Sequence, residues 1–585
     1  MRATYRLQLG PGLGFREARA LVPYLQELGV SHLYLSPSLQ ARAGSTHGYD
    51  VVDPTRISED LGGEEAFRAL CAAGLDVVLD VVPNHMAAVE ENPFWPEVFD
   101  VGRRFFDIDE LGGVRVEEPE VFELTHRKVL ELVRDGAVQG LRIDHVDGLA
   151  RPGEYLQRLA DRGVQRVWVE KILQPSEELP SWPVEGTSGY EFANEVTALF
   201  VDPESEEPLT SLYEELTGER RPFPEVAYDA KLEQARRTFR REVERLAELG
   251  GIPAEEVVRR LAGLPVYRTY RSESGAGSEF VTRFEQTSGA VMAKGVEDTA
   301  FYRYNRFVAL NEVGGDPARF GLALEEFHRA NAKRAERFPL QLLATTTHDT
   351  KRSGDVRARL ASLSWTVDEW RERIRRWRTL DDPNENYLLW QTLVGAWPLE
   401  RERLEAYMEK ALREAKLNTS WIEPNEEHEQ GVLASIRSLY AALPEDFEPF
   451  AARVAEAGRR IALGMTLLKL TGPGVPDLYQ GDELEFLALV DPDNRRPVDW
   501  DLRRRALAHP PPKLRAILAA LELRSRRPNA FSGSYEPLEA GDDVCAFERG
   551  GRVRVAVPVR PHAAKPSFPG WRDLLPDLPV GLYER

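Results

Sequence analysis

The chain has 585 residues and a formal net charge of −20, with 42% hydrophobic and 29% charged residues. This composition is typical of a soluble protein with a sizeable core, and the excess of acidic groups argues against nucleic acid and anionic membranes as partners. The two cysteines, Cys71 and Cys545, have no redox or metal-ligand spacing, so we expect no disulfide framework. Because no segment is apolar enough for a signal peptide or a membrane span, we expect a cytoplasmic location.

The first part of the chain alternates short strands with amphipathic helices. Residues 4–9 alternate like a strand, and apolar residues recur at helical spacing over 15–28 before Gly29. An apolar strand covers 32–37, and a second helix, about 63–73, leads to another strand at 76–85. This alternation predicts βα units and a parallel sheet.

Apolar stretches that end in polar or charged residues recur further along the chain. They are residues 140–149, 166–172, 342–350 and 474–483. In a (β/α)8 barrel the carboxyl ends of all strands face one side, and that side carries the functional site. We therefore predict an α/β fold: a (β/α)8 TIM barrel with helical insertions and a small C-terminal β-domain.

The spacing of these stretches divides the chain into a barrel and its insertions. We assign to the barrel 1–85, 141–195, 340–361 and 460–510. A short excursion over the barrel mouth takes 86–140, including the acidic residues 115–125. A mainly helical insertion takes 196–339, with helical patterns at 229–248 and 317–337, and a second helical insertion takes 362–459. The C-terminal β-domain takes 511–585, with a hairpin turn at Gly550 and Gly551.

The second insertion is rich in tryptophan, at positions 365, 370, 377, 390 and 397. We expect these tryptophans to form a helix-packing core rather than to stack on sugars.

Charged residues interrupt the apolar stretch GLRIDHVDGL, residues 140–149. In an extended strand Arg142 and Asp144 lie on one face, where the guanidinium can orient the carboxylate and keep it ionised. An ionised, oriented carboxylate at a strand end is suited to act as a covalent nucleophile. The alternative is a structural Arg–Asp pair at the barrel mouth.

Four short motifs carry most of the strand-end polar residues and occur in the order DVVPNH, GLRIDHVDGL, VEKIL and TTHDT. In this order the chain resembles glycoside hydrolase family 13, the α-amylase superfamily. The resemblance implies that Asp144 is the nucleophile, Glu170 the general acid/base and Asp349 the third carboxylate, which orients sugar hydroxyls. The substrate-binding residues that it implies are Tyr49, His85, Arg142, His145 and His348; Asp80 is expected to support the arginine. For Tyr49, ordinary packing is the alternative to stacking on the sugar.

The chemistry of retaining glycosidases agrees with these roles. One carboxyl group must be ionised to attack the anomeric carbon, while the other must be protonated to release the leaving oxygen. Asp144 has Arg142 as a cationic neighbour. Glu170 follows three apolar residues, 167–169, a setting that favours its neutral form.

Further stretches resemble the maltooligosyltrehalose synthase family within that superfamily. They are residues 36–54, 291–306 and 416–429, together with the stretch GTSGYEFANEV. The resemblance implies an isomerase acting on maltooligosaccharides, which converts the reducing-end α-1,4 bond to an α,α-1,1 bond by intramolecular transglycosylation. The chain is short between His85 and Leu141, so the size of its lid is open. By resemblance we place Lys294, Glu297, Asp298 and Arg303 beside the acceptor sites, with Trp421 as a candidate sugar platform.

Simpler interpretations remain at this stage. The charges of 294–303 could form an ion-paired helix face, and Asp482 and Glu483 have no assigned role. An α-1,4-glucan hydrolase would share the same core residues, whereas a noncatalytic glucan-binding protein would have no need of three carboxylates. No metal cluster or cofactor motif stands out, so we expect no metal, no cofactor and a monomer.

Overall fold

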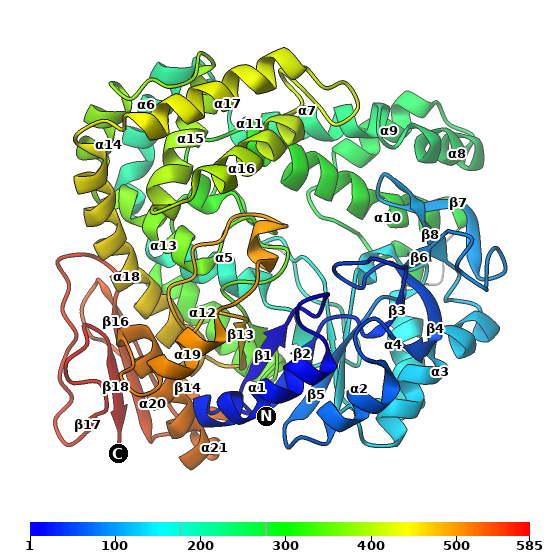
Figure 1. The fold of residues 1–585 in the computed structure, drawn as a ribbon, viewed down its shortest axis with the longest axis horizontal. Helices are drawn as coiled ribbons and strands as arrows, with labels where there is room; N and C mark the ends of the chain where they lie inside the picture. The colour runs from blue at the N-terminus through cyan, green and yellow to red at the C-terminus, as the bar shows by residue number, and fades with distance from the viewer. Residues whose placement is uncertain (176, 275–277) are drawn as a thin grey trace.

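The computed structural model of the chain describes residues 1–175, 177–274 and 278–585, and Figure 1 shows its fold. An eight-stranded parallel sheet lies at the centre, in the order β11-β10-β9-β5-β2-β1-β13-β12. Its strands are β1 (Thr4–Leu7), β2 (His32–Leu35), β5 (Asp76–Val81), β9 (Gly140–Ile143), β10 (Val167–Val169), β11 (Gly186–Thr187), β12 (Leu342–Leu343) and β13 (Val475–Tyr479). The predicted TIM barrel is confirmed, although most strands are shorter than the apolar stretches that predicted them.

The barrel closes where the two end strands of this order meet. Gly189, just after β11, has a φ of 91°, and a Cβ at this position would lie 2.4 Å from the carbonyl oxygen of Leu342 in β12. Only glycine allows this close approach. The two-residue strand β11 carries too little pattern to be recognised from sequence.

Eight helices surround the barrel: α1 (Phe15–Leu28), α2 (Gly63–Cys71), α3 (Pro119–Arg134), α4 (Pro152–Asp161), α5 (Tyr190–Leu199), α13 (Gly354–Ala361), α18 (Phe447–Thr471) and α20 (Pro512–Arg526). Two of them correct our domain boundaries. Helix α3 packs between α2 and α4, since Lys128 contacts Glu64 and His126 contacts Tyr155. It therefore belongs to the outer ring, not to an excursion over the mouth. Helix α20 packs against α1 and α18 and completes the ring, although we assigned it to the C-terminal domain.

Two small antiparallel sheets lie in the loops that follow the barrel strands. One pairs β3 (Leu39–Ala41) with β4 (Val51–Ile57), and the other joins β6 (His85–Ala87), β7 (Phe99–Phe105) and β8 (Ile108–Val114). The C-terminal sheet is also antiparallel and contains β14 (Tyr535–Pro537), β15 (Val544–Arg549), β16 (Val553–Pro558), β17 (Arg572–Asp573) and β18 (Gly581–Glu584). The predicted turn between β15 and β16 is confirmed, with φ of 52° at Gly550 and 67° at Gly551.

The insertions supply the remaining long helices, most of which lie across from the barrel mouth in Figure 1, whereas the helix at 324–337 lies beside the barrel against α5 and β14. The first contributes α6 (Glu206–Thr217), α7 (Phe223–Arg236), α8 (Arg240–Gly250), α9 (Ala254–Ala262), α10 (Glu279–Met292), a π-helix (Ala293–Ala300), α11 (Phe301–Arg303) and α12 (Leu324–Arg337). The second contributes α14 (Val367–Ile374), α15 (Pro383–Ala396), α16 (Arg401–Ala415) and α17 (Glu426–Ala441). Two short helices follow β13: α19 (Trp500–Ala506) and α21 (Pro528–Phe531).

Both helical patterns that we drew in the first insertion need correction. The pattern at 229–248 is two helices, because the backbone leaves helical geometry at Phe239 and buries that ring against α8 and α9. The pattern at 317–337 is helical only from Leu324, since Gly321 has a φ of 82° and interrupts it. In the second insertion, Trp370, Trp377 and Trp390 are at most 3% exposed and pack on Phe447 and Phe450, so their role as core is confirmed.

Across the described ranges, no helix combines the length and the apolar character needed to cross a membrane.

Candidate active site

Asp144 and Glu170 leave the barrel on adjacent strands. The parallel register of β9 and β10 pairs Ile143 with Val169, so the next residue on each strand is one of the two carboxylates. The amide of Glu170 donates to the carbonyl of Ile143 at 2.8 Å, and that of Asp144 donates to Val81 at 2.9 Å. The backbone of the sheet therefore places the two carboxylates side by side.

Arg142 lies beneath both carboxylates and is completely buried. Its Nη1 donates to Oδ1 of Asp144 at 2.5 Å, and its Nη2 lies 3.2 Å from Oε1 of Glu170. Nη1 also donates to Oδ1 of Asp80 at 2.8 Å, which is the supporting contact expected of Asp80. One guanidinium thus fixes the orientation of both predicted catalytic groups.

The protonation of this pair differs from the simple expectation for Asp144. Burial and the nearby carboxylate of Glu170 raise the pKa of Asp144 well above its usual value, although Arg142 acts in the opposite direction. From the sequence we expected Arg142 to keep Asp144 ionised. In the structure, burial and Glu170 oppose that effect of Arg142. A retaining glycosidase needs an ionised nucleophile, and Arg142 is the neighbouring group that favours this form of Asp144.

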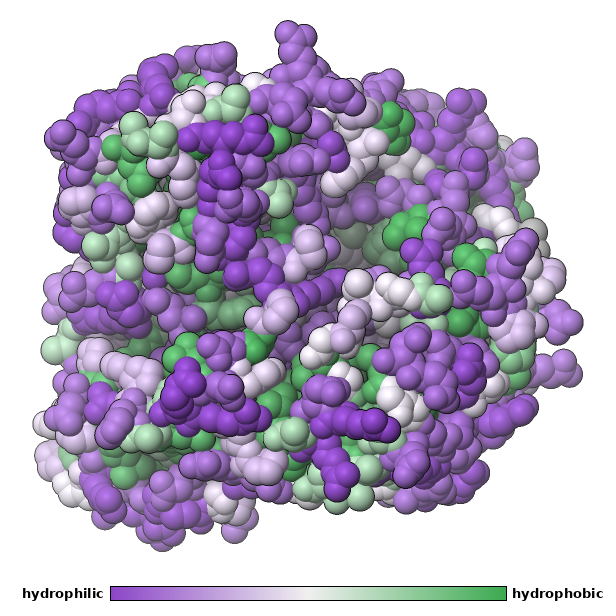
Figure 2. All heavy atoms as spheres, in the orientation of Figure 1, coloured by the Kyte–Doolittle hydropathy of each residue, from purple (hydrophilic) through white to green (hydrophobic). Residues whose placement is uncertain are grey.

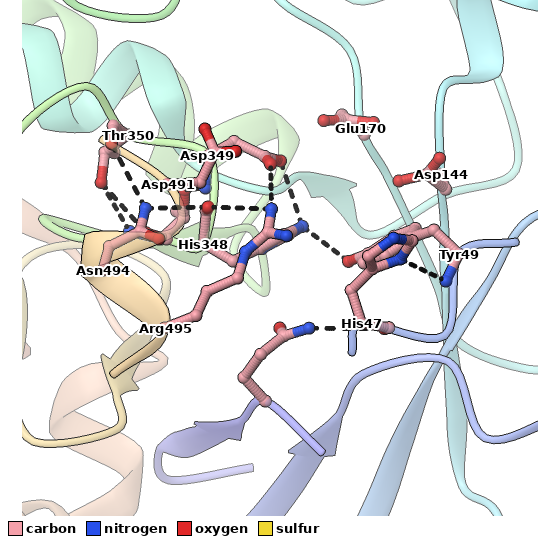
Figure 3. Close-up of polar contacts among 12 residues, drawn as sticks. His47, Tyr49, Asp144, Glu170, His348, Asp349, Thr350, Asp491, Asn494 and Arg495 are labelled. Carbon is pink, nitrogen blue, oxygen red and sulfur yellow. Dashed lines mark hydrogen bonds and ion pairs between the residues drawn. The ribbon is translucent and has the colours of Figure 1, made fainter. Parts of the chain in front are cut away.

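Asp349 faces Asp144 and Glu170 across an open space (Figure 3). Its Oδ2 accepts a hydrogen bond from the hydroxyl of Tyr190 at 3.2 Å, and its Oδ1 lies 3.7 Å from Nη2 of Arg495. Burial and Glu170 raise the pKa of Asp349 to about 6, while Arg495 opposes that shift. The three predicted carboxylates therefore meet at one end of the barrel.

Tyr49 and His348 form a stacked pair beside these carboxylates. Their ring centroids are 5.3 Å apart, and Nε2 of His348 lies 2.6 Å from the hydroxyl of Tyr49 (Figure 3). The same hydroxyl donates to Asp80 at 2.8 Å and accepts from Arg6 at 2.7 Å. Burial lowers the pKa of His348 well below its usual value, so the imidazole is neutral and able to bond hydroxyl groups.

His85 and His145 line the same region. His85 is 1% exposed, and neither of its ring nitrogens has a hydrogen-bond partner among the described residues. Its ring stacks on Phe105 with centroids 3.8 Å apart. His145 has a positive φ of 44°, and its backbone amide donates to Oε2 of Glu170 at 2.8 Å. Contact between the side chain of His145 and sugar stays a prediction, and its backbone amide adds a direct contact to Glu170.

The stretch 291–306 contains the π-helix, and this segment is joined to the Asp349 loop. Nζ of Lys351 lies 2.6 Å from Oδ1 of Asp298, whose other oxygen lies 3.2 Å from Lys294. Burial would raise the pKa of Asp298, but Lys351 and Lys294 hold it well below its usual value. Glu297 accepts a hydrogen bond from Tyr267, and burial raises its pKa to about 7. π-Helical segments often occur at functional sites, and here Lys294 and Asp298 also form an ion pair within the π-helix.

Arg303 and Trp421, the other two residues that we expected to bind substrate, make contacts with the insertion helices. Nε of Arg303 donates to the carbonyl of Ala415 at 2.6 Å, and its Nη2 donates to Glu233 at 2.8 Å, so these contacts hold helices together. Trp421 is 53% exposed, and the guanidinium of Arg413 lies 4.9 Å from its ring centroid. Arg413 thus packs on the indole of Trp421, whose exposed surface could bind sugar. Arg303, in contrast, connects helices of the two insertions.

Asp482 and Glu483, which the sequence left unassigned, are structural. Asp482 lies 3.1 Å from both Lys469 and Lys513. Glu483 accepts hydrogen bonds from Tyr5 at 2.8 Å and Tyr24 at 2.9 Å, and both carboxylates are buried.

Four residues near the site escaped sequence reasoning: Arg6, Tyr190, Lys351 and Arg495. Lys351 follows Asp349 by two residues, and Tyr190 belongs to the quoted stretch GTSGYEFANEV, so both carried a local signal. Arg6 and Arg495 lie in segments near the two ends of the chain, far in sequence from the site motifs, and no local pattern indicated them. Within the described residues, no group of three or more His, Cys, Asp or Glu could hold a metal ion.

Figure 2 shows that the surface is hollowed between the barrel loops and the insertion helices. A barrel with three carboxylates at its strand ends, one arginine beneath two of them and two neutral histidines defines a glycosidase-type enzyme of the α-amylase superfamily. In agreement, residues 20–97 match the family model described as alpha amylase, catalytic domain.

Relatives that match the full length of the chain identify its family within this superfamily. A Mycobacterium tuberculosis protein named maltooligosyl trehalose synthase is 34% identical over 731 aligned positions, covering 99% of this chain and 95% of the relative. Solved structures of maltooligosyltrehalose synthase from Arthrobacter ramosus and of a Sulfolobus tokodaii protein titled maltooligosyl trehalose synthase superpose with TM-scores of 0.93 and 0.91. They are 33% and 32% identical, with full coverage of both chains in each comparison. The chain belongs to the maltooligosyltrehalose synthase family.

Proposed function

We propose that this enzyme converts the reducing-end α-1,4 bond of maltooligosaccharides into an α,α-1,1 bond by intramolecular transglycosylation. The observation that carries the proposal is the contact of Arg142 with both Asp144 and Glu170, at 2.5 and 3.2 Å. This arrangement suits a double displacement, in which one group attacks while the other supplies a proton. Family membership supports the particular outcome of the reaction.

In the first displacement, Glu170 gives its proton to the oxygen of the reducing-end glycosidic bond. The bond from that oxygen to the anomeric carbon breaks as Asp144 attacks the same carbon. The products are a glycosyl ester on Asp144 and a free glucose held in the acceptor site. We assign to His85, His348 and Tyr49 the hydrogen bonds to hydroxyls of the attached sugar, and to Asp349 the orientation of those hydroxyls.

In the second displacement, the bound glucose must turn and present its anomeric hydroxyl to the ester. Glu170, now ionised, takes the proton of that hydroxyl. The hydroxyl oxygen of the glucose then displaces Asp144 from the anomeric carbon and forms the α,α-1,1 bond. Well-oriented groups reach effective molarities of ~10⁵–10⁸ M, so a retained glucose can outcompete water at ~55 M. The walls that retain it are provided by the insertion helices and the π-helix, where we place Lys294, Glu297 and Asp298. We also propose Trp421 as an outer sugar platform and a monomer that needs no metal or cofactor.

Product analysis with maltopentaose tests the proposal. The expected product has the mass of the substrate but no reducing end, and free glucose is a minor product. A rise in reducing ends, with glucose and shorter maltooligosaccharides accumulating, would instead identify an α-1,4-glucan hydrolase that uses the same three carboxylates.

A further inference from the structure

Lys171, the residue after Glu170, is a buried cation that the proposed mechanism does not use. Its side chain is 0% exposed, and its Nζ lies 3.2 Å from Oδ2 of Asp147 and 3.4 Å from Oε1 of Glu177. It also donates to the carbonyl of Ile172 at 2.8 Å. Burying a lysine is costly unless it is paired, so this ion pair is a specific feature of the site.

The first insertion completes the surroundings of this pair. Nζ of Lys171 lies 5.7 Å from the ring centroid of Tyr267 and 5.6 Å from that of Tyr270. Tyr270 donates a hydrogen bond to Oδ1 of Asp147, and Arg268 donates to the carbonyl of Asp147 at 2.7 Å. Tyr267 donates a hydrogen bond to Glu297 in the π-helix, and Glu285 lies 3.6 Å from Arg268. Around Glu170 itself lie Arg142, Asp144, Asp349 and His145, and the imidazole of His145 also faces Asp147, Arg103 and Arg268.

Asp147 belongs to a single 3₁₀ turn, Val146–Gly148, that directly follows His145. The amide of His145 donates to Oε2 of Glu170 from a left-handed backbone conformation, which is unfavourable for a residue with a side chain. Such a conformation persists only where the surrounding contacts hold it. Lys171, Tyr270 and Arg268 all contact Asp147, two residues after His145. These contacts therefore fix the position of the His145 amide.

We propose that the Lys171–Asp147 ion pair is a positioning device for the general acid/base: it holds the His145 amide against Glu170 and balances the charge around that carboxyl group. The inference rests on the proposed role of Glu170. The two partners act on its proton in opposite directions. The charge of Lys171 favours the ionised carboxylate, whereas the charge of Asp147 favours the protonated acid.

The sign of the effect can therefore be tested with single and double variants. Removing the cation in Lys171→Met should move the basic limb of the rate profile to higher pH, and Asp147→Asn should move it to lower pH. Each shift should be roughly 0.5–1 pH unit for the loss of one buried charge in the surroundings of this carboxyl group. The double variant should return the limb close to its wild-type position, and Lys171→Arg should largely keep it. Both single variants should also lose about 10-fold in kcat, because misplacing a catalytic group costs rate.

The assay should follow the disappearance of maltopentaose, whatever its product, between pH 4 and 9. A wild-type enzyme that hydrolyses would then disprove the proposed function while leaving this inference testable. Lys469→Met is a matched control, since Lys469 is equally buried and paired with Asp482 at 3.1 Å, away from the acid/base. It should reduce thermal stability without moving the basic limb. If the single variants fold and their limbs coincide with that of the wild type, the pair is only structural and the proposal is wrong. If Lys171→Met does not fold, Asp147→Asn alone decides by the same criterion.

Discussion

Lys351 forms an ion pair with Asp298, with 2.6 Å between Nζ and Oδ1, and this pair connects the barrel to the first insertion. Lys351 lies two residues after Asp349, and Asp298 lies in the π-helix. Lys416 of the second insertion donates to the carbonyl of Asp298 at 2.7 Å. Three separate segments of the chain therefore meet at Asp298, beside the loop of the third carboxylate.

Replacing Asp298 by Asn should loosen this junction. Lys351 and Lys294 would both lose their carboxylate, and we expect a loss of about 2 kcal/mol in the free energy of unfolding. If the junction forms a wall of the acceptor site, free glucose should also become a larger share of the products. Thermal denaturation and a glucose assay measure the two effects. Asp368→Asn is the control, because Asp368 pairs with Arg371 on the surface with 93% of its side chain exposed and should change neither quantity. An unchanged glucose share in Asp298→Asn would place the junction outside the acceptor site.

The second prediction concerns the two displacement steps. Asp144→Asn and Glu170→Gln should each abolish nearly all turnover, since proton transfer alone contributes ~10²–10⁴-fold and the nucleophile more. Affinity for maltopentaose, measured by calorimetry, should largely remain, because the binding residues are unchanged. The wild-type rate should depend on pH as a bell, and Glu170→Gln should erase the basic limb in any residual activity. Near-normal turnover in either variant would remove that residue from its role.

Short-range patterns predicted the part of this molecule that depends on neighbours in sequence. Asp144 and Glu170 could be found because each directly follows an apolar strand, and parallel strands bring their carboxyl ends together. The contact of Arg142 with Asp144 followed from their alternate positions in one strand. In contrast, Arg6 reaches Tyr49 and Asp80 from β1, and Arg495 reaches Asp349 from the segment that follows β13, the last barrel strand in sequence. Such pairings depend on barrel closure, which a local pattern does not encode.

The boundaries of the predicted domains failed for a related reason. Helix α20 has the pattern of any amphipathic helix, and only its packing against α1 and α18 shows that it closes the ring. The proton distribution was equally out of reach, because the pKa of Asp144 depends on burial and on Glu170 more than on its neighbour in sequence.

The third prediction compares two buried histidines that differ in their partners. His85 and His126 are both 1% exposed, but the ring nitrogens of His85 have no partner within the described structure. In His126, Nε2 lies 2.7 Å from the hydroxyl of Tyr155, and Nδ1 lies 2.9 Å from Thr125. Burying an unpaired polar group costs stability, so His85→Leu should stabilise the fold by about 1 kcal/mol and lower the rate, whereas His126→Leu should destabilise it. Melting temperatures and maltopentaose turnover measure both effects. A loss of stability in His85→Leu without a loss of rate would show that His85 serves packing rather than substrate.

The last prediction follows from the pKa of His126. Burial lowers its pKa to about 4, whereas an unfolded chain has a histidine pKa near 6.5. Between these values the unfolded state binds more protons than the folded state, so the stability that a neutral His126 permits is complete above pH ~6.5 and falls as the pH drops toward 4. The contribution is roughly 3 kcal/mol over this window for a fully buried group. Urea unfolding at pH 4.5 and pH 7.5 should therefore show a smaller difference in His126→Leu than in the wild type. Replacing His562, an exposed histidine that pairs with Asp543 at 2.8 Å with 72% of its side chain exposed, should leave that difference unchanged. Equal pH dependence in His126→Leu and the wild type would mean that other groups, such as His85 or His348, cause the acid sensitivity.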